Sequence, residues 1–499
     1  RLQILTGGVR DAPLRQQTLR NTLAWSYDLL SAEEQRLFRR LSIFVGGCTL
    51  EAAEVVCNAA NDLGMDVLEG IASLIDKSLL QQTEQEAEEP RLLMLETIRE
   101  YGLEALSANG ELEVTRRAHA AYYLVLAERV EPELGGPQQV MWLERLEREH
   151  DNLRVAMEWA IEQGEIGGSM EIALRMCAAL GWYWFVHDHL SEGRKWMEPA
   201  LTGSEGAVTP MRGKVLRTAG LLAFEQGDYE RAEALCGESL IPLRELGDTV
   251  GLANSLHILG LIAGARRNYP TALTLIEESL AFSKRVDDGR SMAYALDDLA
   301  YMAFQQGEYA RAESLAEEAL ALFRRVGDKR GIAYSLENLG RVIFNQGDPT
   351  RAYPLLQEAL ALFRGVGDKL GVAVLLNLLG QIAILQGDDT TARLLLEEAL
   401  ALSKEMRDSL NIAKGLYGSG RLAFCQNDNT VARTLYAESL AIFRELDHKE
   451  GVASCLEGLA SVLATEGDLL GAARLWGTAE SLRKSMGAPL PPIYRADYE

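Results

Sequence analysis

The chain has 499 residues, of which 47% are hydrophobic and 25% are charged. This length exceeds what one core usually holds, and the composition is ordinary for a soluble protein, so several domains are expected. The formal net charge of −23 argues against a nucleic-acid-binding surface, because no basic patch of useful size interrupts it. No uncharged apolar run approaches ~18 residues, so the sequence predicts no membrane span.

The start of the chain and its cysteines indicate a compartment. The sequence begins at Arg1, without an initiator methionine or a signal peptide, so we expect a piece of a longer, cytoplasmic chain. The cysteines are scattered, without a Cys-x-x-Cys pair, and we interpret them as small buried apolar residues rather than metal ligands or disulfides. They are Cys48, Cys57, Cys177, Cys236, Cys425 and Cys455.

Residues 1–108 have the outline of a winged helix with an N-terminal lead. Ser31 and Glu34 have the spacing of a capping box, in which each side chain bonds a free backbone N–H of the other. Thr49 is the expected N-cap of a later helix. The predicted elements are helices at 19–30, 31–41, 49–57 and 66–75, strands at 78–82 and 91–95 around an acidic turn at 84–89, and a helix at 97–107.

A winged helix often binds DNA, and this alternative stays open for residues 1–108. The segment in the position of a recognition helix, 66–75, carries two acidic residues and no basic residue. DNA binding requires lysine or arginine for the phosphates and polar side chains for the bases. We therefore expect no direct nucleic-acid contact from this module, and salt-dependent DNA binding by it would favour the alternative.

Residues 109–205 predict an irregular helical connector. Five of the seven tryptophans lie here, and we interpret them as the core of a helical bundle rather than a ligand cage. His187 and His189 flank Asp188, but their i, i+2 spacing on a helix would place them on different faces, so no metal site is expected. The predicted helical segments are 119–130, 138–149 and 153–163.

Residues 206–485 contain seven repeats of 40 residues, with no insertion or deletion. A fixed period in this range is the signature of a solenoid, in which neighbouring units share one continuous core. The repeated motif, which reads Gln346-Gly-Asp-Pro-Thr-Arg-Ala352 in the fourth unit, recurs at 226–232, 266–272, 306–312, 346–352, 386–392, 426–432 and 466–472.

Each repeat predicts an antiparallel pair of helices. In the unit 329–368, Gly347 tolerates a positive φ where the first helix ends, and Pro349 suits the first turn of the second. A small residue late in the first helix and an alanine such as Ala352 in the second allow close backbone approach. The small residues are Gly220, Gly260, Ala300, Gly340, Gly380, Gly420 and Ala460. A leucine column interpreted as core comprises Leu235, Leu275, Leu315, Leu355, Leu395, Leu435 and Leu475.

The repeats resemble the tetratricopeptide repeat in their small-residue column, Gly-Asp-Tyr turn and alanine column. The expected fold class is therefore mainly α, with a winged-helix domain followed by an α-solenoid of tetratricopeptide-like helix pairs in a right-handed superhelix. The expected domains are 1–108, 109–205, 206–485 and a proline-rich tail at 486–499.

A second resemblance covers most of the chain. The order of several motifs is similar to the region downstream of the nucleotide-binding domain in bacterial STAND signalling ATPases, including large LuxR-type and AfsR-type regulators. The motifs lie at 5–8, 15–20, 25–30, 41–47, 74–79, 91–101 and 150–154. In such proteins the repeats bind an inducer and release an ADP-locked switch. Leu95 stands where relatives carry a histidine on the ADP phosphate, and its side chain has no donor, so this contact is not carried over.

The resemblance places one face of each first helix in a concave groove. In 329–345, Leu336 and Leu339 face the core. Tyr334, Glu337 and Arg341 lie on the opposite side. The core columns are uniform, whereas this polar face varies and mixes tyrosine, arginine and asparagine, which is typical of a recognition surface. A solvated face without a ligand is the alternative. The candidate groove residues are Lys214, Arg217, Asn254, His257, Tyr294, Asp297, Tyr301, Tyr334, Glu337, Arg341, Asn377, Gln381, Tyr417 and Arg421. Further equivalent positions are Glu225, Lys414, Glu457 and Ser461, with Phe224, Phe304, Phe344 and Phe424 at the groove edge.

The sequence has no Gly-x-x-x-x-Gly-Lys-Ser/Thr motif and no catalytic constellation. We therefore expect no enzyme activity and no cofactor in this chain, and ADP or ATP only in an upstream domain. The expected function is the sensing region of a STAND-type ATPase. Its expected partners are a protein, peptide or small-molecule inducer in the groove and the upstream nucleotide-binding domain. The alternatives are a free-standing tetratricopeptide scaffold and a DNA-binding regulator.

Overall fold

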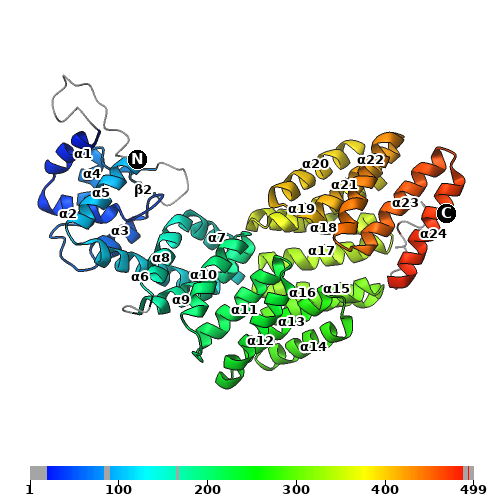
Figure 1. Cartoon of the computed structure of the whole chain (residues 1–499), viewed down its shortest axis with the longest axis horizontal. Coiled ribbons are helices and arrows are strands. Elements are labelled where there is room, and N and C mark those ends of the chain that lie inside the picture. The colour runs from blue at the N-terminus through cyan, green and yellow to red at the C-terminus, as the bar shows by residue number, and fades with distance from the viewer. Residues whose placement is uncertain (1–18, 84–89, 165–167, 487–492, 494–499) are drawn as a thin grey trace. The chain divides into compact units, whose positions relative to one another are not determined.

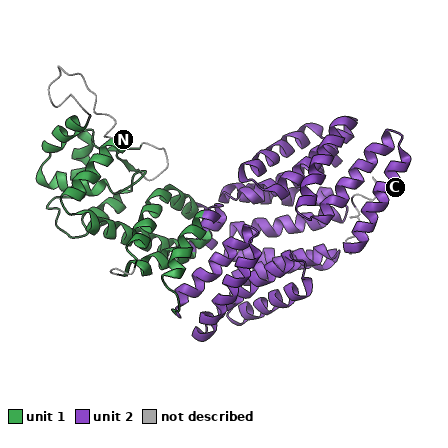
Figure 2. Ribbon diagram, in the orientation of Figure 1, with its two compact units in different colours: residues 1–132, 141–182, 192–207 green, residues 133–140, 183–191, 208–499 purple. Residues whose placement is uncertain are grey.

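The computed structural model describes residues 19–83, 90–164, 168–486 and 493. The predicted lead, the acidic turn at 84–89 and nearly all of the predicted tail lie outside these residues. The backbone forms two compact units, coloured separately in Figure 2. The first unit comprises 1–132, 141–182 and 192–207, and the second comprises 133–140, 183–191 and 208–499. The predicted connector therefore contributes to both units.

The first unit begins with the predicted winged helix. The capping box forms, since Ser31 accepts from the Glu34 backbone N–H and Glu34 accepts from that of Ser31. The strands are shorter than predicted, because Ser78 has a positive φ and the chain turns there before it can pair. The elements are α1 (Leu19–Asp28), α2 (Ala32–Leu41), α3 (Leu50–Cys57), α4 (Val67–Asp76), β1 (Gln81–Gln82), β2 (Leu92–Leu93) and α5 (Glu96–Ala108), with β1 and β2 antiparallel.

The connector helices follow. Helix α6 begins at Leu112 rather than at the predicted 119, because the helical hydrogen bonds already start when Thr115 N–H bonds Glu111 O. Trp159 and Trp184 are buried, in agreement with their interpretation as core residues. The elements are α6 (Leu112–Val130), η2 (Glu131–Gly135), α7 (Gln139–Arg148), α8 (His150–Glu162), α9 (Ser169–Val186) and α10 (Leu190–Thr202).

A buried polar cluster joins the winged helix to α8 within the first unit. Asn152 is fully buried; it accepts from the Val45 N–H at 2.8 Å and donates to Gly47 O at 2.9 Å. Glu149 accepts from Asn152, from Tyr123 and from Arg91. Three sequence motifs that lie far apart along the chain thus meet in one place, where each buried polar group finds its partner.

Seven helix pairs form the α-solenoid of the second unit, stacked in chain order (Figure 1). The prediction of seven repeats is confirmed. The pairs are α11 (Pro210–Glu225) with α12 (Tyr229–Leu246), α13 (Thr249–Ala265) with α14 (Tyr269–Arg285), α15 (Gly289–Gln305) with α16 (Tyr309–Val326), α17 (Lys329–Asn345) with α18 (Pro349–Val366), α19 (Lys369–Leu385) with α20 (Asp389–Met406), α21 (Ser409–Cys425) with α22 (Asn429–Glu445) and α23 (Lys449–Thr465) with α24 (Leu469–Met486).

The turn between the two helices of a repeat explains the glycine, aspartate and proline that the fourth repeat carries there. Gly347 has φ +99°, as the turn requires, and Pro349 opens α18. Asp348 then caps α18 by accepting from the Arg351 N–H. Aspartates also cap five of the first helices, where their side chains accept backbone N–H groups. Part of the chain's negative charge therefore lies at helix N-termini.

The packing inside a repeat corrects one prediction. The small-residue column does allow close approach, since a Cβ on Gly340 would lie 2.6 Å from the Leu356 side chain. Leu356 is fully buried, whereas Leu355, which we expected in the core, is only partly buried. The two residues are neighbours on one helix, and the helical pattern alone did not decide which of them meets the glycine.

Five of the six cysteines are buried, as expected, but Cys425 is exposed. Within the described ranges, every helix is either too short or too polar to cross a bilayer.

Candidate functional site

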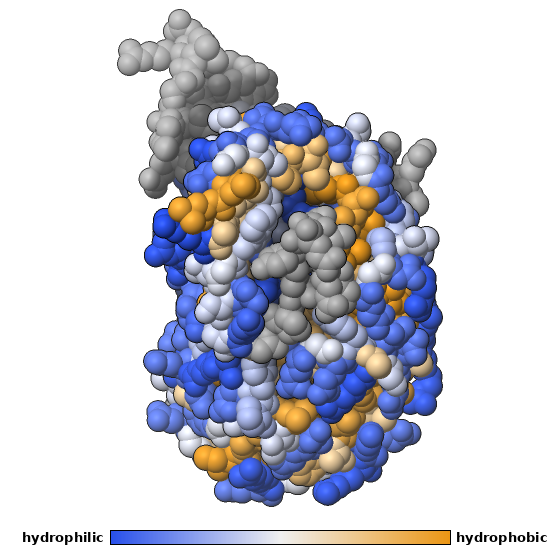
Figure 3. Space-filling view, turned by 90° about the vertical axis from the view of Figure 1, so that its right-hand side faces the viewer, coloured by the Kyte–Doolittle hydropathy of each residue, from blue (hydrophilic) through white to orange (hydrophobic). Residues whose placement is uncertain are grey.

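A cavity of about 540 Å³ opens among the first helices of repeats three to seven. Figure 3 shows the side of the molecule that lies to the right in Figure 1, where hydrophilic and hydrophobic residues are intermixed on the surface. Six of the predicted groove residues line the cavity: Tyr301, Arg341, Asn377, Gln381, Tyr417 and Arg421. The further positions Lys414, Glu457 and Ser461 and the aromatic residues Phe304, Phe344 and Phe424 line it too.

The last repeat adds residues that sequence reasoning missed. Trp476 and Arg483 reach the cavity from α24, a second helix, although only first helices were considered. Arg483 donates to both carboxylate oxygens of Glu457, at 2.6 and 2.8 Å. At the equivalent position, 40 residues apart, the six earlier repeats carry leucine, serine or phenylalanine, so the charge of Arg483 was the available signal. The exposed Cys425 also lines this cavity.

The other predicted groove residues lie outside this cavity: Lys214, Arg217, Asn254, His257, Tyr294, Asp297, Tyr334 and Glu337. Several of them connect neighbouring repeats. Asn254 accepts from Ser291 at 3.0 Å, and His257 contacts the carboxylate of Asp298. Asp297 is buried and accepts from Ser335 and Asn338, both at 2.8 Å. Burial, together with Asp298, raises the pKa of Asp297 to about 8.

Tyr294 and Tyr334 belong to a repeated inter-repeat bond. Arg330 donates to Asp368 at 2.8 Å and to the Tyr334 hydroxyl at 2.9 Å, and the Tyr334 ring packs on Phe363. The same Asp368 caps α19. One repeat earlier, Arg290 and Tyr294 bond Asp328 in the same way, at 2.9 and 3.2 Å. An arginine, a tyrosine four residues later and the N-cap aspartate of the next first helix thus fasten consecutive repeats.

The segments 133–140 and 183–191 pack against these bonds within the second unit. Gln139 is fully buried; it donates to Asp328 at 3.2 Å and accepts from the Arg330 backbone N–H at 3.1 Å. The Arg330 guanidinium lies 4.3 Å from the centre of the Phe185 ring. Helix α17 therefore carries connector contacts at its start and cavity residues, including Arg341 and Phe344, near its end.

Several charged side chains lie near Arg341. Arg341 pairs with Glu337, one turn earlier on α17, as predicted. Lys414 also lines the cavity and belongs to α21. Its pKa is lowered by burial and by the positive charge of Arg341. Asn377 lies on α19, between these two helices in chain order, and only 3% of its surface is exposed.

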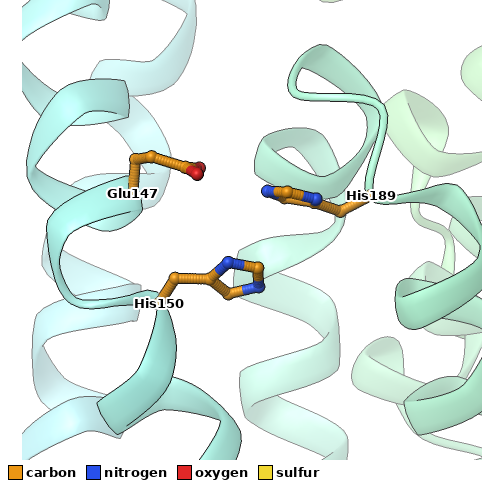
Figure 4. A group of neighbouring side chains, drawn as sticks. All are labelled: Glu147, His150 and His189. Atoms are coloured by element: carbon orange, nitrogen blue, oxygen red, sulfur yellow. The ribbon is translucent and has the colours of Figure 1, made fainter. Parts of the chain in front are cut away.

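The histidine segment differs from its predicted geometry. His187 and His189 lie in the turn between α9 and α10 and not on a helix, since Asp188 has a positive φ. Their rings stack with centroids 6.2 Å apart, so the helix-face argument does not apply. Figure 4 draws His189 of the second unit and Glu147 and His150 of the first. Within the first unit His150 bonds Glu192 at 2.9 Å. The absence of a metal stays a prediction.

Helix α4 occupies the place of a recognition helix in the winged helix. Its exposed residues include Leu68 and Glu69, with Asp66 at its N-cap. This surface offers no basic side chain until Lys77, which follows the helix and bonds Glu34. The absence of nucleic-acid contact stays a prediction.

Comparisons with known proteins agree with this organisation. A family model described as a tetratricopeptide repeat matches residues 251–325 and 331–405, and a model described as a winged helix-turn-helix domain matches 30–107. Putative HTH-type transcriptional regulators of Mycobacterium tuberculosis and Mycobacterium bovis are 36% identical over 263 residues, which is 51% of this chain and 29% of theirs. The match therefore spans less than a third of these curated relatives.

A solved structure shows a similar fold. It is a Signal Transduction ATPase with Numerous Domains (STAND) protein with a tetratricopeptide repeat sensor from Pyrococcus horikoshii. The TM-score is 0.54 at 15% identity, and the match covers 99% of this chain and 67% of that one. The chain thus contains a winged helix-turn-helix domain and tetratricopeptide repeats, and its fold is similar to that of this STAND protein over the matched part.

Proposed function

We propose that this chain is the sensing region of a STAND-type signalling ATPase, and that the cavity binds an extended peptide or protein segment as its inducer. The observation that carries the proposal is the lining of the cavity by successive first helices, from α15 to α23. An extended segment can contact several of these helices at once. A small-molecule inducer is a weaker candidate, because the lining residues are spread over five repeats.

The proposed signal passes through α17. Binding at Arg341 and Phe344 acts on the end of this helix, and Gln139 and Phe185 contact residues at its start. The chain continues from these connector segments into α7 and α10. ADP or ATP would act in a nucleotide-binding domain outside this chain, and the connector would transmit the inducer signal to it. The putative regulator names of the mycobacterial relatives support a role in transcriptional control.

The first test selects ligands without assuming their sequence. Random peptides displayed on phage are enriched on the wild-type chain and then assayed on Gln381→Trp, which places a large ring at the cavity wall. Gln357→Trp, on the exposed side of α18, is the matched control. We expect the peptides to bind wild type and the control but to lose at least about tenfold in affinity on Gln381→Trp.

Cys425 supplies an independent readout, because it is exposed and lines the cavity while the other cysteines are buried. A peptide bound in the cavity should slow the alkylation of this thiol. Peptides that bind Gln381→Trp as tightly as wild type and leave Cys425 fully reactive would show that the cavity is not the sensing site.

A further inference from the structure

The second repeat contacts the turn that joins the sixth and seventh repeats, 180 residues further along the chain. Arg267, in the turn between α13 and α14, donates from Nη2 to the backbone carbonyl of Asp447, in the turn between α22 and α23, at 3.0 Å. In a solenoid each repeat ordinarily contacts only its neighbours. This bond therefore links two distant parts of the repeat array and brings the array back on itself.

The cavity has walls on both sides of this link. Tyr301 and Phe304 line it from the end of α15, the first helix of the repeat that follows Arg267. His448 and Glu450 line it from the start of α23, directly after Asp447. Opening the bond would therefore let these two parts of the cavity wall move apart.

Arg267 adopts a backbone conformation that favours glycine. Its φ is +60°, whereas five of the seven repeats carry glycine at the equivalent position, with φ between +73° and +99°. These glycines are Gly227, Gly307, Gly347, Gly387 and Gly467. A positive φ is sterically unfavourable for most residues with a side chain. We therefore attribute the arginine at this turn to its side chain, which reaches Asp447.

The acceptor side of the bond is connected to the cavity wall. The Asp447 carbonyl also accepts from the Lys449 N–H at 3.1 Å, which its two lone pairs allow. The next residue, His448, caps α23 by accepting from the Gly451 N–H at 3.0 Å, and its ring stacks on Phe443 with centroids 5.1 Å apart. His448, Gly451 and Phe443 all line the cavity. A movement of the Asp447 turn is thus transmitted to the cavity.

The bond is also weak enough to open. Arg267 and Asp447 are both exposed, so water can replace the bond, and one such hydrogen bond contributes little net free energy. We propose that Arg267 and the Asp447 carbonyl form a clasp that closes the repeat array beside the cavity, and that opening of the clasp admits and releases the ligand. The role in ligand entry rests on the proposed function, whereas the clasp itself does not.

Pulsed electron paramagnetic resonance tests the clasp without a ligand. Spin labels are attached through Thr274→Cys and Glu445→Cys, at exposed positions on either side of the bond, after Cys425→Ser has removed the exposed native thiol. Arg267→Gly should add a population at longer distance. Arg267→Asn, which suits a positive φ but is too short to reach Asp447, should do the same.

Arg407→Gly is the matched control. Arg407 is likewise an exposed arginine with a positive φ, +57°, in a turn between repeats. The control therefore relieves the same backbone strain and should leave the distance distribution unchanged. Thermal unfolding establishes that each variant remains folded.

Stopped-flow fluorescence tests the role in ligand entry, with a labelled peptide from the phage selection on the chain with its native cysteines. Arg267→Gly should accelerate both association and dissociation at least about threefold and leave the affinity nearly unchanged, because it removes one exposed hydrogen bond that holds the closed state. A residue with a purely structural role would alter neither rate in the folded protein, and Arg407→Gly should alter neither.

Other outcomes would overturn the proposal. Equal distance distributions for Arg267→Gly and Arg407→Gly would show that no clasp holds the array closed. A longer distance with unchanged peptide rates would show that the clasp does not control ligand entry. If no selected peptide binds in the cavity, the proposed function and the role in ligand entry both fail, while the distance distribution still decides whether the clasp exists.

Discussion

Replacing Arg330 by alanine is expected to lower the free energy of unfolding by about 3–5 kcal/mol, the usual cost of removing one partner from a buried ion pair. The side chains of Arg330 and Asp368 are 6% and 4% exposed and pair at 2.8 Å. The substitution leaves the Asp368 carboxylate buried with fewer donors. It also removes the cation that packs on Phe185 and bonds the Tyr334 hydroxyl.

Urea denaturation followed by circular dichroism measures this effect. Arg364→Ala is the matched control, because Arg364 pairs with Glu398 across consecutive repeats but both side chains are about half exposed. Exposed pairs of this kind contribute about 0–1 kcal/mol. A loss on Arg330→Ala no larger than that on Arg364→Ala would mean that the inter-repeat bond does not hold α17 against α19.

Replacing Leu356 by alanine is expected to lower the free energy of unfolding by roughly 2–5 kcal/mol, because it leaves a cavity next to Gly340 at a fully buried position. Leu355→Ala removes the same atoms from a partly buried position and should cost less. Since neighbouring repeats share their core, hydrogen exchange should accelerate most in the adjacent pairs α15 with α16 and α19 with α20. Equal costs for the two leucines, or faster exchange confined to the winged helix, would contradict this packing.

The regular part of the fold was predictable because the repeat shows its structure seven times. Glycine is expected at 347 because the turn needs a positive φ, and a small residue is expected at 340 because two helices approach closely there. The structure confirms both expectations. The choice between Leu355 and Leu356 was not predictable, since both lie on the apolar side of one helix. Only the position of the opposite glycine in three dimensions selects Leu356.

The site was predictable in part for a similar reason. Helical spacing identified the polar face that holds Arg341 and Asn377. It could not separate residues open to the cavity from residues such as Tyr334, whose hydroxyl is bonded by Arg330 and lies 3.4 Å from Asp368, the N-cap of the next repeat. A signal was present in the sequence, since an aspartate follows each of Arg290 and Arg330 at 38 residues. Hydrogen-bond partners that far apart become evident only when the stacking of repeats is known.

The central claim, that the cavity binds an inducer and α17 passes the signal to the connector, is tested most directly by hydrogen exchange on the full chain. Exchange is compared with and without a peptide that has been selected for the cavity. The account predicts slower exchange in α17, α19 and α21 together with altered exchange in 133–140 and 183–191. Exchange in those connector segments that does not change while the peptide protects α19 and α21 would contradict it.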